Sequence, residues 1–230
     1  MSRRDFLLFL LLTTGAVVIG PRGRLLAAQV PGAAAWPRGW PVRGTPLAAD
    51  PKTGTVAMYA EISLRHLTET TTHWGIGCET GKFADRFILV SPAEPPALYD
   101  ALIRIGARPG NNLAPDGYGK TVEGDVLALT AAWPGLPREV DAGGLFYDSS
   151  GKGFRFRFGG NRRAAEEQRT GCLTCLESCP VGITSNAVYP HLSTARRIFR
   201  PNSRFRGRPE VLPAREAFPL VVFYRLAGKG

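Results

Sequence analysis

Three of the four cysteines of this 230-residue chain lie within eight residues, and this run constrains the fold more than any other feature. From Gly171 to Pro180 the chain reads GCLTCLESCP, which is a C-x2-C-x3-C-P pattern. A loop with this spacing can curl so that its sulfurs converge, and bacterial ferredoxin cluster loops also end in Cys-Pro. We therefore expect a cysteine-rich loop at 172–179 that holds one metal ion or cluster through Cys172, Cys175 and Cys179.

The run does not supply a fourth thiol. The bacterial ferredoxin pattern has a further cysteine three positions earlier, where this chain has Arg169. Cys78, which ends the glycine-rich segment GIGC, is the remaining cysteine. An all-cysteine [4Fe-4S] site therefore requires the fold to bring Cys78 against Cys172.

Two other interpretations of the cysteines remain open. Four cysteines in an exported protein can form two disulfides and hold no cofactor. Alternatively, the three clustered cysteines can bind structural zinc with either Cys78 or His191 as the fourth ligand. His73 and Trp74, near Cys78, either modulate such a centre or are packed in the core.

The N-terminus has the order of a signal peptide. Arg3 and Arg4 precede an apolar run from Phe6 to Ile19, and this arrangement is typical of twin-arginine export. We expect residues 1–35 to form the signal, with cleavage after residue 28 or 35, and the protein to reach the periplasm or cell envelope. An iron-sulfur cluster is assembled in the cytoplasm and has to be exported inside a folded chain, so the signal supports the cluster interpretation.

The rest of the chain has the length of one domain. Residues 36–51 are rich in proline, glycine and alanine, which predicts a linker before a domain at 52–230. The chain has a formal charge of +10 and stays basic after removal of the signal, and much of the excess lies in Arg162-Arg163, in Arg196-Arg197 and in the run from Arg200 to Arg208. A basic face can dock an acidic redox partner or an anionic membrane, or remain solvated. No nucleic-acid-binding motif is present.

Alternating apolar residues predict strands at 55–64, 125–133, 154–158 and 218–226, and shorter apolar runs predict strands at 86–90 and 144–148. Ser91 and Glu94 form a capping box, which predicts a helix over about 92–105 with Leu98, Ala101, Leu102 and Ile105 on its buried side. The expected class is α+β, a mainly antiparallel β-sheet with one clear helix.

Other motifs are weak. Gly117 to Thr121, GYGKT, ends like a phosphate-binding loop, but Ala114 occupies the position of the first glycine, so we expect a turn. No acid–base pair or nucleophile is positioned by the sequence pattern. An electron carrier or accessory protein is therefore favoured over an enzyme, and no specific small-molecule ligand is predicted.

Several segments resemble the YdjY-like family, whose members are commonly described as 4Fe-4S ferredoxin-type proteins. The resemblance rests on residues 70–77 with 82–85, 99–112, 158–161 and 171–186. It implies an exported domain with a cysteine cluster suspected of holding iron and sulfur, and no established reaction. Family members often have serine where this chain has Cys78, which leaves open a non-cysteine fourth ligand, an incomplete cluster or a disulfide.

The sequence therefore predicts an exported iron-sulfur protein with a [4Fe-4S] cluster on Cys172, Cys175, Cys179 and Cys78. Such a protein acts in electron transfer or as a redox accessory, with an acidic redox protein or a membrane redox complex as partner. The alternative is a non-redox binding or scaffold domain stabilised by disulfides or structural zinc.

Overall fold

The computed structural model describes residues 35–194 and 204–227, and Trp36 begins the compact unit that contains the domain. The predicted signal peptide lies outside these residues, apart from Ala35. Arg196, Arg197 and Arg200 of the basic segment also lie outside them. No helix in the described part of the chain is long and apolar enough to cross a membrane.

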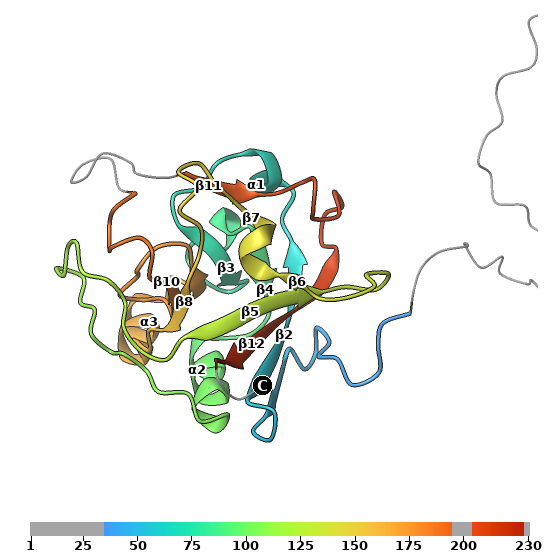
Figure 1. The fold of residues 1–230 in the computed structure, drawn as a ribbon, viewed down its shortest axis with the longest axis horizontal. Coiled ribbons are helices and arrows are strands. Elements are labelled where there is room, and N and C mark those ends of the chain that lie inside the picture. Colours follow the sequence, from blue (N-terminus) through green and yellow to red (C-terminus); the bar gives the residue numbers. More distant parts are fainter. Residues whose placement is uncertain (1–34, 195–203, 228–230) are drawn as a thin grey trace, which may run out of the picture. The chain divides into compact units, whose positions relative to one another are not determined.

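A ten-stranded sheet forms the centre of this unit, and it curls into a half-barrel (Figure 1). Nine strands follow one another in the order β6-β5-β12-β2-β4-β3-β9-β10-β8, and β1 pairs with β2 beside this path. The strands of the sheet are β1 (Leu47–Asp50), β2 (Thr55–Ile62), β3 (Trp74–Cys78), β4 (Leu89–Ser91), β5 (Leu127–Ala132), β6 (Val140–Asp141), β8 (Phe156–Phe158), β9 (Cys172–Cys175), β10 (Thr184–Asn186) and β12 (Pro219–Leu226). A separate two-stranded sheet joins β7 (Phe146–Asp148) to β11 (Phe205–Gly207).

The predicted mainly antiparallel α+β domain with one clear helix is wrong, because the structure is mostly β and its sheet is mixed. The pairs β3–β4 and β9–β10 are parallel. Each parallel pair requires the chain to cross over the sheet between the two strands. Short apolar runs in the sequence do not reveal strand direction, so the crossovers could not be predicted from them.

The helices are short. They are α1 (Arg65–Thr68), α2 (Pro95–Arg104) and α3 (Arg162–Gln168), with 3-10 turns η1 (Ala84–Arg86) and η2 (Ala142–Leu145).

Helix α2 begins three residues later than the predicted 92–105 helix. Ser91 Oγ donates to Tyr59 O at 2.6 Å and accepts from Ala93 N at 3.1 Å, so it forms a local turn instead of capping the helix. The predicted buried side is confirmed, since Leu98, Ala101, Leu102 and Ile105 are all buried. The helix ends at Arg104, and Gly106 just beyond it has a φ of +89°, which is accessible to glycine.

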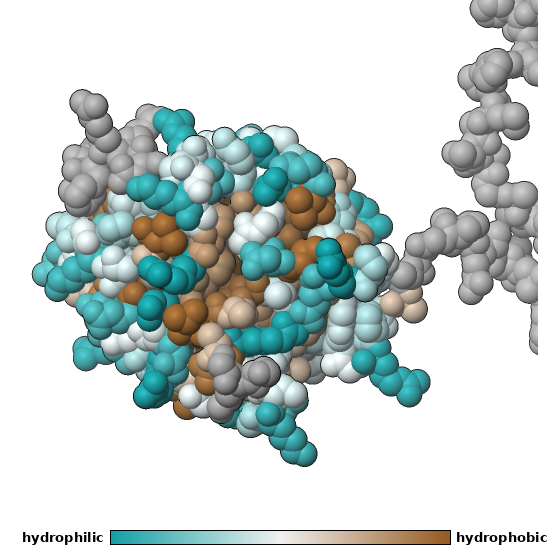
Figure 2. Space-filling view, in the orientation of Figure 1, coloured by the Kyte–Doolittle hydropathy of each residue, from teal (hydrophilic) through white to brown (hydrophobic). Residues whose placement is uncertain are grey.

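Strand β2 lies at the centre of the sheet and carries the clearest alternation. Val56, Met58, Ala60 and Ile62 are at most 1% exposed and belong to the main core. This is the side predicted to be buried. Figure 2 shows apolar side chains gathered in the middle of the viewed face, with polar side chains around them.

The segment expected to be a linker, 36–51, contains β1, whose residues pair with the start of β2. Trp36 and Trp40 lie edge to face, 5.4 Å between ring centroids, and pack against Ala132, Val221 and Phe223. This segment therefore covers part of the sheet.

Candidate metal centre

The sulfurs of Cys172, Cys175 and Cys179 converge, as their spacing predicts. All three Sγ atoms lie within 4.8 Å of one another. The three residues are 0%, 0% and 4% exposed. Among the side chains that the structure describes, this group is arranged so that it could hold a metal ion.

The parallel pairing of β9 and β10 produces this convergence. Cys172 and Cys175 are the first and last residues of β9, and the chain then crosses to the start of β10 at Thr184. Because β10 runs in the same direction as β9, the connecting loop turns back over the sheet. Cys179 lies in this loop and is brought back beside the other two thiols.

Hydrogen bonds hold the loop in place. Asn161 Nδ2 donates to Cys179 O at 3.0 Å and to Gly182 O at 3.3 Å. Ser178 N donates to Tyr189 O at 2.8 Å. The position of Cys179 is thus fixed from both sides of the loop.

An apolar shell surrounds the thiols. Phe87 is fully buried and belongs to the same cluster as the three cysteines, with Trp74, Phe83 and Val181 packed against it. Trp74 contacts Phe87 edge to face at 5.3 Å between ring centroids, and the Phe83 ring at 4.9 Å. Such a shell limits the access of solvent and sets the local dielectric around a centre.

The three thiols shift one another's pKa values. Hydrogen bonds from Cys172 and then Cys175 hold the pKa of Cys179 well below its ordinary value. The same contacts with Cys172 and Cys179, together with burial, raise the pKa of Cys175 well above its ordinary value. The thiolate form is therefore favoured at Cys179, where the two neighbouring thiols serve as donors.

A buried carboxylate lies in the same loop. Glu177 is 2% exposed. Its Oε2 accepts from Thr194 Oγ1 at 2.7 Å and from Thr194 N at 3.0 Å, and its Oε1 lies 3.4 Å from His73 Nδ1. His73 stacks on Trp74 with 4.4 Å between ring centroids. The sequence left open whether His73 and Trp74 are packed in the core or modulate a metal centre. In the structure Trp74 is part of the apolar shell of the cysteine group, and His73 lies against Trp74.

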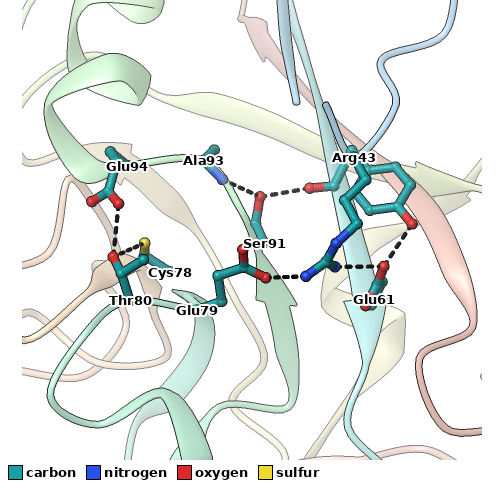
Figure 3. A network of polar contacts seen from close by, with 9 residues as sticks. Arg43, Glu61, Cys78, Glu79, Thr80, Ser91, Ala93 and Glu94 are labelled. Atoms are coloured by element: carbon teal, nitrogen blue, oxygen red, sulfur yellow. Dashed lines mark hydrogen bonds and ion pairs between the residues drawn. The ribbon is translucent and has the colours of Figure 1, made fainter. Parts of the chain in front are cut away.

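Cys78 lies outside this group. Its N donates to Gly171 O at 2.8 Å, so its backbone runs beside the cysteine run. Its side chain belongs to the main core, where Sγ lies 3.0 Å from Thr80 Oγ1, which donates to Glu94 Oε1 at 2.7 Å (Figure 3). Adjacent residues of a strand face opposite sides, and it is Gly77 that faces Phe87 of the cysteine shell.

The ring nitrogens of His191, the other ligand considered for zinc, contact backbone carbonyl oxygens. Its Nδ1 lies 3.3 Å from Ser178 O and its Nε2 lies 3.4 Å from Pro115 O. All four cysteines are free thiols in the structure.

Sequence reasoning missed Ser185. This residue pairs with Cys175 across β9 and β10 and is fully buried. Among the described residues its Oγ has no hydrogen-bond partner. A Cβ added to Gly182 would lie 3.0 Å from this oxygen and 3.1 Å from Cys175 Sγ, which places both atoms around the same point. A sequence offers no signal that places Ser185 beside Cys175, because this position depends on the register of the parallel β9–β10 pair.

The comparisons with known proteins agree with the resemblance in sequence. The model of the YdjY domain matches residues 47–225. The chain is 39% identical over 179 residues to an uncharacterized protein YdjY of Escherichia coli (strain K12), which covers 77% of this chain and 78% of that protein. No solved structure matches the chain. Because the matched region includes the sheet, the cysteine run and its shell, this chain belongs to the YdjY domain family.

Proposed function

We propose that this protein binds one soft metal ion through the thiolates of Cys172, Cys175 and Cys179, and that it does so in the cell envelope after twin-arginine export. The observation that carries the proposal is the convergence of three buried sulfurs within 4.8 Å of one another. Cysteine sulfurs are the ligands that select Cu(I), Zn²⁺ and iron-sulfur centres in proteins.

The spacing of the sulfurs favours a single ion. A thiolate binds zinc at about 2.3 Å, so two thiolates at tetrahedral positions on one ion lie about 3.8 Å apart. The observed limit of 4.8 Å requires little movement of the side chains. A cluster places several irons between the same sulfurs and requires them to separate further.

Buried donors fit a charged centre. A metal-bound thiolate accepts hydrogen bonds, and the hydroxyl of Ser185 is buried beside Cys175 without a partner among the described residues. The backbone N–H of Val181 also lowers the pKa of Cys179, after the larger effects of Cys172 and Cys175. These groups offset part of the cost of burying thiolates.

A second candidate is an iron-sulfur electron carrier that docks an acidic redox partner. It is supported by the C-x2-C-x3-C-P run, which ends as ferredoxin loops do, and by Arg3 and Arg4, which suit the export of a folded chain. This candidate takes its fourth ligand from a group other than Cys78, whose side chain lies in the main core.

Metal analysis of the anaerobically purified protein tests both candidates. For a single ion we expect about one zinc or copper per chain and a colourless protein, since both d¹⁰ ions lack visible bands. A [4Fe-4S] cluster instead gives a brown protein with about four irons per chain. Protein without metal, both as purified and after anaerobic incubation with Zn²⁺, Cu(I) or iron and sulfide, would contradict both.

A further inference from the structure

A cavity of about 400 Å³ lies beside the cysteine loop and is basic. Its volume is within the range of sites for small molecules, about 300–1,000 Å³. Its lining residues are Asn112, Lys120, Thr121, Val122, Glu123, Arg155, Arg157 and Ala187. Three cationic side chains thus share the cavity with a single carboxylate.

Arg157 lies in strand β8, and Arg155 directly precedes this strand. Phe156 and Phe158 are 4% and 0% exposed, so Arg155 and Arg157 project from the opposite side of the strand. Strand β8 ends the sheet, beyond β10 (Figure 1). Both guanidinium groups line the cavity, which suits an anion with several oxygens.

The charges in the cavity are not neutralised by the protein. None of the ion pairs found in the described part of the chain involves Lys120, Arg155 or Arg157. Arg157 Nη1 donates to Gly124 O at 2.7 Å, which orients its guanidinium group. Seven of the fifteen other arginines in the described part of the chain form ion pairs with carboxylates, as Arg162 and Arg225 do.

The loop that carries Lys120 is held in position. Asn112 Nδ2 donates to Thr121 O at 2.9 Å, and Asn112 Oδ1 accepts from Glu123 N at 3.0 Å. His191 N donates to Lys120 O at 2.8 Å. An arrangement that exists before the ligand arrives loses less freedom when the ligand binds.

The cavity also adjoins the cysteine loop. Val122 N donates to Ser178 Oγ at 3.0 Å, and Ser178 directly precedes Cys179. A ligand in the cavity would therefore lie next to the segment that positions Cys179.

We infer that this cavity binds a small anion with several oxygens, either a phosphate or a dicarboxylate, through Arg155, Arg157 and Lys120. The GYGKT segment contributes Lys120 and Thr121 as ordinary cavity residues and not as a phosphate-binding loop, because Gly117 N and Lys120 N bond within a turn. The inference does not depend on what the three cysteines hold.

Isothermal titration calorimetry of the purified full-length chain tests the inference. Inorganic phosphate and succinate are titrated separately at constant ionic strength, up to about 10 mM, which nearly saturates a site with a dissociation constant of 1 mM. We expect saturable binding of at least one anion at one site per chain, and the anion that binds identifies the ligand class. We expect Arg155→Gln to weaken it about tenfold or more, as the loss of a charge-assisted hydrogen bond does.

Arg104→Gln is the matched control, because Arg104 is exposed at the end of α2 and does not line the cavity. It should leave the affinity unchanged. Lys120→Gln provides a second variant on a different element, and it too should weaken binding. Failure of both anions to saturate the wild-type protein, or equal weakening by Arg155→Gln and Arg104→Gln, would overturn the inference.

Discussion

Cys179→Ser is expected to abolish the metal binding that we propose for the three cysteines. The substitution deletes one of three thiolates that converge within 4.8 Å. Loss of a group that only orients a metal ligand costs about 10–100-fold in affinity, so loss of a ligand should cost more than about a hundredfold. Metal content per chain and a competition titration with a chelator measure the change.

Cys78→Ser is the matched control for this variant. Cys78 is also a buried cysteine, but its thiol lies beside Thr80 in the main core, and burial raises its pKa. A serine hydroxyl can keep the contact with Thr80, so we expect the metal content to stay at the wild-type value. Equal loss of metal in the two variants would show that Cys78 belongs to the site.

Gly77→Ala is expected to destabilise the domain by about 3 kcal/mol, the upper end of the usual cost of overpacking. A Cβ at this position would lie 2.1 Å from two carbons of the Phe87 ring. Phe87 is fully buried in one cluster with the three cysteines, and Trp74 packs against this cluster. Urea unfolding followed by tryptophan fluorescence gives the free energy of unfolding.

Gly44→Ala makes the same chemical change where nothing lies within 4 Å of the added carbon. Its effect on the free energy of unfolding should stay within about 0.5 kcal/mol. If the Gly77→Ala protein is as stable as the Gly44→Ala protein, this result would contradict the close approach of β3 to Phe87.

Local patterns in the sequence predicted six of the twelve described strands, β2, β4, β5, β7, β8 and β12, and missed the other six. The alternation of β2 identified the buried residues Val56, Met58, Ala60 and Ile62, and the apolar spacing of α2 identified its buried side. These predictions succeed because burial of one face imposes a period on each element separately. The start of α2 was misplaced because the hydroxyl of Ser91 is used by Tyr59, a residue far away in the sequence.

The order and direction of the strands could not be predicted in this way. β9 pairs with β3 on one side and in parallel with β10 on the other. Both pairings are set by contacts between distant segments and leave no periodic signal. The mixed sheet therefore appeared only in the structure.

The candidate site was partly predictable for the same reason. The local spacing of Cys172, Cys175 and Cys179 was enough to predict their convergence. Whether Cys78 joins them depends on which face of β3 it occupies. The β3–β9 pair contains a register shift, so this face cannot be predicted from the sequence. The shell residue Phe87, between η1 and β4, and the hydroxyl of Ser185 in β10 likewise come from other segments.

X-ray absorption spectroscopy of the metal-loaded protein tests the central claim most directly. If Cys172, Cys175 and Cys179 hold one ion, the spectrum should show three sulfur neighbours at about 2.3 Å and no second metal at short distance. When it is loaded with excess metal, Cys179→Ser should show fewer sulfur neighbours than the wild-type protein, and Cys78→Ser should show the same number. A first shell without sulfur would contradict the proposed site, and a short metal–metal distance would replace the single ion with a cluster.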